Sequence, residues 1–105
     1  MSIDEKFLPL RKGLLEFAVL KVIANASVYA ADILATLGTT EFSSQEGTLY
    51  PLLSKLRREE LVAYEWQESE SGPPRKYYSL TAKGRAQLKE LENYWKTIYK
   101  EITNL

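Results

Sequence analysis

The stretch EGTLYPLLSKLRREELV, residues 46–62, decides the fold, because it predicts a helix that carries both Gly47 and Pro51. A proline inside a helix deprives the carbonyl four residues earlier of its donor. That residue is Gly47, which has no side chain and leaves room for water or another donor. We therefore expect bent first turns and an N-terminal end that approaches another surface closely. The alternative is a helix that starts near Thr48, with Pro51 in its first turn. The leucines give the helix one apolar face, at the spacing i, i+3, i+4, i+7: Leu49, Leu52, Leu53 and Leu56.

Two further helices are expected upstream of this stretch. Apolar positions at helical spacing predict one over residues 8–25, with Pro9 in its first turn, where the missing N–H costs nothing. A shorter helix is expected over residues 28–37, with Gly38 as its C-terminal cap. Ser43, three residues before Glu46, matches a capping box, so the third helix is predicted to begin at Ser43.

The apolar period changes from helical to alternating after residue 60. Val62, Tyr64 and Trp66 alternate with less apolar residues, which predicts a strand with one buried face. The segment ESESGPP, residues 68–74, is a polar stretch rich in turn residues, and residues 75–80 form a second strand. We expect a hairpin with a long tip.

The last helix is predicted to start after Thr81 as its N-cap and to run to about residue 103. Its apolar residues follow a heptad spacing, with the first three helices and the hairpin already filling a core. We therefore expect this stripe to pack against a second copy of the chain: Leu88, Leu91, Trp95, Ile98 and Ile102. The alternative is that the stripe folds back onto Phe7, Leu8 and Leu14 of its own chain.

Histidine and cysteine are both absent from the 105 residues, and lysine plus arginine equals aspartate plus glutamate at 14 each. Without those side chains no Ser-His-Asp or Cys-His set can be assembled, so we expect no enzyme, no cofactor and no metal site. The N-terminal residues lack the apolar stretch of a signal peptide, and no run approaches the roughly 20 apolar residues that span a membrane. A cytoplasmic protein that works by binding is expected.

The element order is helix, helix, helix, strand, turn-rich loop, strand, which predicts a mostly helical α+β winged helix-turn-helix. Residues 1–80 would form the DNA-binding domain and residues 81–105 a dimerisation helix, in one compact unit. Because the net charge is zero, an argument for DNA needs local clusters. Residues 71–89 hold five basic residues and no acidic one, and the third helix adds Lys55, Arg57 and Arg58. Double-stranded DNA is therefore the favoured partner; a winged-helix module that binds protein without DNA is the alternative.

With these residues in view, the sequence resembles the PadR family of bacterial transcriptional regulators. The resemblance is carried by GTLYP at residues 47–51, GPPRKYY at residues 72–78 and LTAKG at residues 80–84. It implies a winged helix-turn-helix that binds DNA as a homodimer, usually as a repressor, with the last helix forming the dimer. The single C-terminal helix resembles the short branch of the family.

The resemblance also implies roles for individual residues. Thr48 and Tyr50 match recognition-helix residues that contact phosphate, and Lys76 and Tyr77 match the wing. Ala30 stands where many members have a glycine, in a turn that opens the second helix. On the recognition face, Gln45 and Lys55 are the best candidates to read bases. The full predicted DNA-binding set is Ser44, Gln45, Thr48, Tyr50, Lys55, Arg75, Lys76 and Tyr77.

Trp95 resembles a tryptophan with which short-branch relatives hold flat aromatic ligands between paired copies at the dimer interface. A large side chain that only packs in the interface is the alternative reading. Together these observations predict a homodimeric repressor that covers a two-fold symmetric operator and is released from it by a small molecule or another signal.

Overall fold

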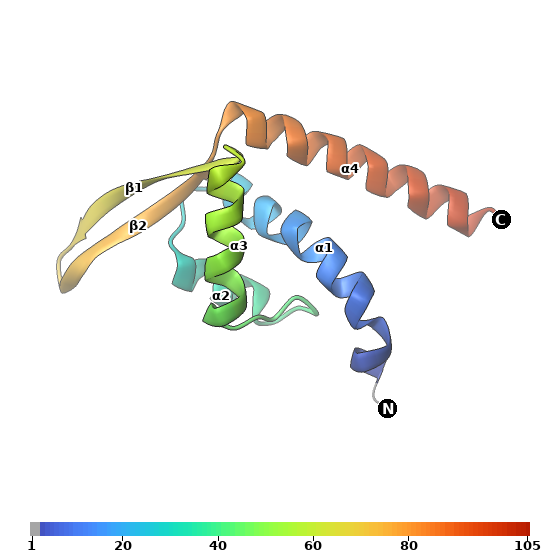
Figure 1. Cartoon of the computed structure of the whole chain (residues 1–105), viewed down its shortest axis with the longest axis horizontal. Coiled ribbons are helices and arrows are strands. Elements are labelled where there is room, and N and C mark those ends of the chain that lie inside the picture. Colours follow the sequence, from blue (N-terminus) through green and yellow to red (C-terminus); the bar gives the residue numbers. More distant parts are fainter. Residues whose placement is uncertain (1–2) are drawn as a thin grey trace.

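In the part of the chain that the computed structural model describes, residues 3–105, three helices precede a two-stranded antiparallel hairpin and a long C-terminal helix (Figure 1). This order confirms the predicted mostly helical α+β class. The elements are α1 (Ile3–Asn25), α2 (Ala30–Leu37), α3 (Glu46–Arg58), β1 (Val62–Ser69), β2 (Gly72–Leu80) and α4 (Ala82–Thr103).

Aliphatic side chains from all four helices and both strands form one core. The apolar face predicted for α3 supplies three of its fully buried members, Leu49, Leu53 and Leu56, whereas Leu52 is half-buried. Each fully buried leucine or isoleucine contributes roughly 1.5–3 kcal/mol, so this cluster holds the helices together. The other core residues include Val19, Leu20, Ile23, Ile33, Leu37, Leu61, Val62, Tyr78, Leu80 and Leu88.

The first helix starts earlier than the sequence indicated. It begins at Ile3, so Pro9 lies inside α1 and the prediction that it occupies the first turn was wrong. Pro9 has no N–H to donate to the Glu5 carbonyl, which lies one turn earlier. Both residues are exposed, so that carbonyl is accessible to solvent. The second helix starts at Ala30 rather than Val28, because Val28 forms a backbone bridge with Tyr78 of β2. Gly38 caps this helix as predicted.

The start of α3 also differs from the prediction. Its N-cap is Gln45, without a side-chain cap bond, so the capping box of Ser43 and Glu46 was wrong. The preceding loop turns through its own bonds instead: the Ser43 N–H donates to the Thr40 carbonyl at 3.2 Å. Since α3 begins before Gly47, the alternative start near Thr48 was wrong as well.

The Gly47–Pro51 pair lies on the surface. Pro51 is inside α3, and both residues are exposed. A methyl group added at Gly47 would meet nothing within 4 Å outside the helix itself, so this end of α3 is open to another surface.

The hairpin is longer and its tip shorter than expected. The strands extend to Ser69 and from Gly72, which leaves a turn of Glu70 and Ser71 in place of the predicted long loop. The pairing is irregular between Gln67 and Ser69, and two consecutive prolines, Pro73 and Pro74, lie in β2 opposite that region. Successive backbone N–H groups point to opposite edges of a strand, so one proline can face the unpaired edge and the irregular pairing accommodates the other.

Burial along β1 ends sooner than the alternating pattern predicted. Val62 is buried and Tyr64 is half-buried, but Trp66 is 61% exposed, so its expected burial was wrong. The hairpin projects away from the helices beyond this point (Figure 1). Tyr78 and Leu80 of β2 are buried on one face, as predicted.

A tight junction joins α3, the hairpin and α4. Thr81 is the N-cap of α4, as predicted: its hydroxyl oxygen accepts from the Gly84 N–H at 2.9 Å and its hydroxyl donates to the Glu60 carbonyl at 2.6 Å. Glu60 has φ 62°, the left-handed conformation that turns the chain from α3 into β1. Gly84 is required by contact: an added Cβ would overlap the Leu61 carbonyl oxygen and lie 2.9 Å from its carbon.

Beyond Leu88, α4 runs away from the core and diverges from α1 toward their free ends (Figure 1). Exposure along the predicted stripe is 6% at Leu88, 38% at Trp95 and 68% at Ile102, while Leu91 and Ile98 are half-buried. Over residues 3–105, no helix is both long enough and apolar enough to cross a membrane.

We predict that Gly84→Ala lowers the free energy of unfolding by about 1–3 kcal/mol, because the added methyl group forces the backbones at Gly84 and Leu61 apart. Urea unfolding at a fixed protein concentration measures the change. Gly47→Ala is the matched control: its methyl group has open space, and it should stabilise the exposed helix by about 0.5–1 kcal/mol. Equal stability of Gly84→Ala and the wild type would contradict the contact.

Candidate nucleic-acid interface

A groove runs between α3, the start of α2 and the hairpin. Tyr50, which is 48% exposed, and Ser54 line it from α3, one helical turn apart. Arg75 and Lys76 line the opposite side from β2. Three of the eight predicted DNA-binding residues are therefore brought together here, with cations and hydroxyl groups facing one channel.

Contacts between inclined aromatic rings attach the hairpin to the N-terminus of α2. The Arg75 guanidinium lies 4.7 Å from the ring centroid of Tyr29, and the Tyr29 and Tyr77 rings are 5.4 Å apart. Beside them Val28 and Tyr78 exchange two backbone hydrogen bonds, with N–O distances of 3.0 and 2.6 Å. The predicted wing residues Arg75 and Tyr77 are thus oriented by the turn that opens α2.

A second set of contacts between cations and aromatic rings lies on the hairpin beside α3. The Lys76 amine lies 4.5 Å from the Tyr64 centroid and 5.4 Å from that of Trp66, while the Arg57 guanidinium lies 4.7 Å from Tyr64. An aromatic ring attracts a cation through its quadrupole and supplies no compensating negative charge, whereas a carboxylate does. These contacts orient Lys76 and Arg57 and leave their charges available to phosphate.

Ser44, Gln45 and Thr48 form a separate group at the other flank of the α3 N-terminus. They line a cleft against α1, whose basic residues Arg11 and Lys12 form the opposite wall. The Ser44 hydroxyl donates to the Phe42 carbonyl at 2.9 Å, and Gln45 and Thr48 are exposed. The predicted set is therefore divided over two sides of α3.

Lys55 belongs to neither group. Its amine donates a hydrogen bond of 3.0 Å to the Glu16 carboxylate of α1. That bond, followed by the charges of Glu16 and Glu59, raises the pKa of Lys55 above its ordinary value. The structure thus directs Lys55 toward α1 instead of the groove.

The model of the PadR-like family of transcriptional regulators matches residues 19–90, which include α2, α3, the hairpin and the start of α4. The chain belongs to this family. An uncharacterized protein of Lysinibacillus sphaericus is 30% identical to it over 90% of this chain and 88% of its own length.

Solved structures of family members share both fold and length with this chain. A PadR-like transcription factor from Bacteroides fragilis is 42% identical, with a TM-score of 0.81 over 95% of this chain and 97% of that one. A PadR family regulator from Eggerthella lenta is 30% identical, with a TM-score of 0.87 over 97% of this chain and 89% of that one. A third, from Bacillus cereus, is 35% identical, with a TM-score of 0.80 over 89% and 91%.

Membership identifies the chain as a DNA-binding transcriptional regulator with a winged helix-turn-helix fold. The family is one of regulators and not an enzyme class. The groove between α3 and the hairpin lies where such a fold places its recognition helix and wing.

The groove residues that the predicted DNA-binding set lacks include Tyr29, Ser54 and Trp66. Trp66 was assigned to the core because it continues an alternating pattern. Its cross-strand partner is Lys76, and a charged partner is the signal that this part of the strand lies outside the core. Tyr29 gave no signal, since its contact with the hairpin depends on the bridge between Val28 and Tyr78.

Tyr78 lies under this groove and is 7% exposed. Burial is the largest cause that raises its pKa above 10.0; Tyr64 and Tyr50 act in the same direction, and Arg57 opposes them. A raised pKa means that the folded state holds the phenol proton more tightly than the unfolded state does.

We predict that this tyrosine makes the fold sensitive to alkali. Its contribution is fully present below pH 10, the unfolded pKa, and is lost as the pH rises through the higher folded value. Urea unfolding from pH 8 to pH 11 should show a smaller alkaline loss of stability for Tyr78→Phe than for the wild type. Identical slopes for the two proteins would contradict the role of Tyr78.

Proposed function

We propose that the protein is a homodimeric transcriptional repressor. Two copies pair through α4 and α1, and each places α3 and its hairpin on one half of a two-fold symmetric operator. The bound dimer blocks polymerase sterically, and a signal received at the dimer interface releases it.

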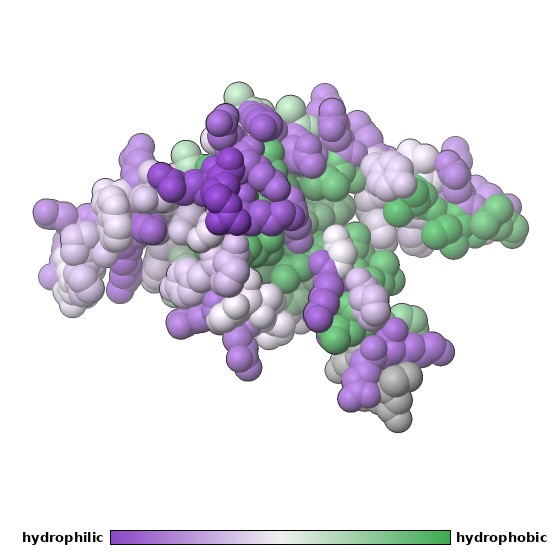
Figure 2. Space-filling view, in the orientation of Figure 1, coloured by the Kyte–Doolittle hydropathy of each residue, from purple (hydrophilic) through white to green (hydrophobic). Residues whose placement is uncertain are grey.

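The exposure of the α4 stripe carries this proposal. Leu88 is buried in its own chain and Leu91 is half-buried, but exposed apolar residues continue to the end of the helix. Figure 2 shows this hydrophobic surface along α4 and beside α1. An apolar surface of this kind on a soluble domain marks an interaction site. The exposed aromatic and aliphatic residues of α4 and its C-terminal end are Tyr94, Trp95, Tyr99, Ile102 and Leu105.

Folding of the stripe back onto α1 of the same chain does not account for it. Phe7 is 50% exposed, and Leu8 and Leu14 are only half-buried, so α4 of the same chain leaves part of this apolar surface open. Leu14 and Phe17 of α1 share open grooves with Trp95 of α4, on both sides of the line between the helices. Helices of a second copy, which carry the same apolar surfaces, fit these grooves.

For DNA contact we propose the two groups on α3 and the hairpin. Tyr50, Arg75, Lys76 and Tyr77 meet the phosphate backbone from the wing side of α3. Ser44, Gln45 and Thr48 lie at the N-terminal end of α3, the part of a recognition helix that enters the major groove. In this group Gln45 has the side chain best suited to read a base.

Trp95 is the proposed site for a planar aromatic signal molecule. Its ring lies 6.2 Å from that of Tyr99, inclined by 41°, and faces the grooves that a dimer would enclose. A ligand there shifts the equilibrium only by its differential affinity for the DNA-binding arrangement and another one. Quenching of tryptophan fluorescence by planar compounds tests this site.

We predict that Ile98→Glu with Ile102→Glu makes the protein monomeric, because four carboxylates in the dimer would be placed in an apolar interface. Sedimentation equilibrium at micromolar concentration measures the change. Lys100→Glu is the control, because Lys100 is exposed on the side of the helix opposite Ile98 and Ile102, and it should leave the dimer intact. A double variant that stays dimeric would show that α4 is not the interface.

We predict that the protein binds DNA from upstream of its own gene with a steep salt dependence, and that Lys76→Gln lowers the slope of log affinity against log salt by about 0.9 for each half-site. Fluorescence anisotropy between 50 and 200 mM salt measures both. Lys100→Gln removes the same charge near the C-terminal end of α4, on the side opposite Ile98 and Ile102, and should leave the slope unchanged. Absence of binding to this DNA at low salt would favour a protein-binding module.

A further inference from the structure

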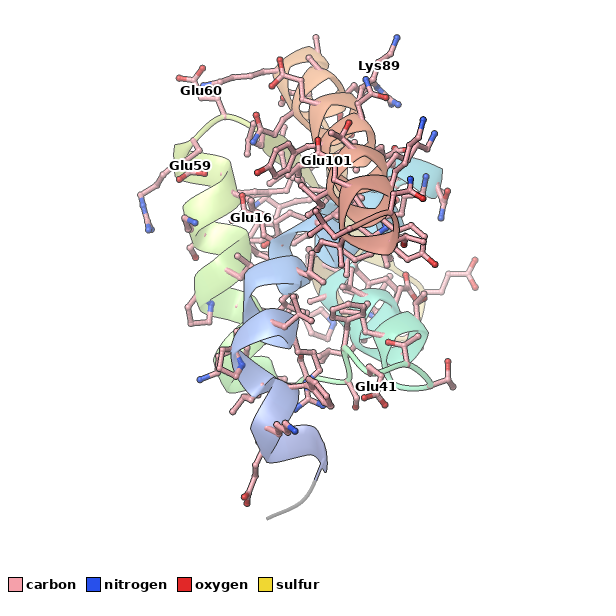
Figure 3. All side chains as sticks on the ribbon, turned by 90° about the vertical axis from the view of Figure 1, so that its right-hand side faces the viewer. Glu16, Glu41, Glu59, Glu60, Lys89 and Glu101 are labelled. Carbon is pink, nitrogen blue, oxygen red and sulfur yellow. The ribbon has the colours of Figure 1, made fainter. Side chains whose placement is uncertain are left out.

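An ion pair joins α1 to α3, two helices that the proposed function assigns to different tasks. The Lys55 amine and the Glu16 carboxylate are 3.0 Å apart and hydrogen-bonded, and their side chains are 50% and 27% exposed. Figure 3 shows Glu16 on α1, on the side toward α3. The contact links positions 39 residues apart in sequence, so it constrains the packing of the two helices.

Lys55 lies on a different side of α3 from the residues that line the wing groove. Ser54 faces that groove, and successive residues on a helix point about 100° apart. The carboxylate therefore holds the Lys55 amine on the flank that faces α1. A lysine engaged in this way fixes a helix instead of contacting phosphate.

Glu16 has a second neighbourhood. It lines the groove between α1 and α4, together with Leu91, Tyr94, Trp95 and Ile98. One carboxylate thus borders the proposed dimer surface and bonds directly to the recognition helix. The carboxylate that bonds to Lys55 is therefore also in reach of a group that occupies this groove.

We propose that Glu16 is a positioning residue for DNA binding. Through Lys55 it fixes the C-terminal half of α3 against α1, and it connects the occupancy of the α1–α4 groove to the orientation of α3. The inference rests on the proposed function, because it takes α3 as the DNA-binding helix and the groove as the dimer surface. Lys55, predicted from the sequence to read bases, acts here through Glu16.

A double-mutant cycle on DNA affinity tests this. Glu16→Gln, Lys55→Gln and the double variant are titrated against a duplex that the wild-type protein selects from a random pool, at concentrations where each protein sediments as a dimer. We expect each single variant to bind about two- to fivefold more weakly for each half-site, and the double variant no more weakly than the singles. The slope of log affinity against log salt should change by less than the roughly 0.9 expected for the loss of one phosphate contact.

The ion pair of Lys21 and Glu92 is the matched control. It joins α1 to α4 at 3.5 Å, with side chains 58% and 34% exposed, and the same Gln substitutions remove the same charges. Its variants reproduce any effect of net charge on DNA affinity, and we expect no coupling between them. The exchanged variant Glu16→Lys with Lys55→Glu restores an ion pair at unchanged net charge and should recover affinity.

The opposite role for Lys55 gives a different pattern. If Lys55 contacts phosphate and Glu16 competes for it, Glu16→Gln strengthens binding, Lys55→Gln lowers the salt slope by about 0.9 for each half-site, and the exchanged variant does not recover. That pattern, or coupling no larger than in the control pair, overturns the inference alone. A wild-type protein that selects no duplex overturns the proposed function, and the inference with it.

Discussion

The packing of Gly84 against the Leu61 carbonyl, with Thr81 bonded to both sides of the junction, is the constraint on which the rest of the structure depends. It fixes the start of α4 over the point where α3 gives way to β1. Because β1 carries the hairpin and α4 carries the exposed apolar stripe, this contact sets the geometry between the proposed DNA-binding and dimer surfaces. No residue other than glycine fits there without a shift of backbone.

Around that junction, α1 is the common neighbour. Its Val19, Leu20 and Ile23 are in the core, its basic residues border the N-terminus of α3, and its apolar flank forms grooves with α4. Two ion pairs leave α1, from Glu16 to α3 and from Lys21 to α4, and the first of them reaches the helix that we propose to bind DNA.

The sequence predicted the element order, the leucine face of α3, the Thr81 cap and the buried residues of β2, because these depend on local periodicity and on capping chemistry. It failed where a distant partner overrides local preference. The predicted capping box at Ser43 does not form, because Ser43 takes part in the turn bonds of the loop before α3. Val28 lies outside α2, because it pairs with Tyr78. Trp66 was misjudged because alternation shows which side a residue faces, whereas its burial depends on how far the core extends.

The same limit applies to the candidate site. Residue type indicated cations and hydroxyl groups on α3 and the hairpin, and the structure brings Tyr50, Arg75 and Lys76 to one groove. Local spacing did not indicate that Lys55 meets Glu16, which is 39 residues away, or that Tyr29 would orient the hairpin. Pairings between separate elements follow from how the helices pack.

The two adjacent prolines of β2 affect how readily the hairpin associates with other chains. A two-stranded ribbon that projects from its domain exposes backbone donors and acceptors along its margins, and such margins recruit strands from other chains into aggregates. Pro73 and Pro74 offer no N–H to an incoming strand, and the irregular pairing opposite them further spoils the template. The hairpin can thus project from its domain with a lower tendency to pair with strands of other copies of the chain.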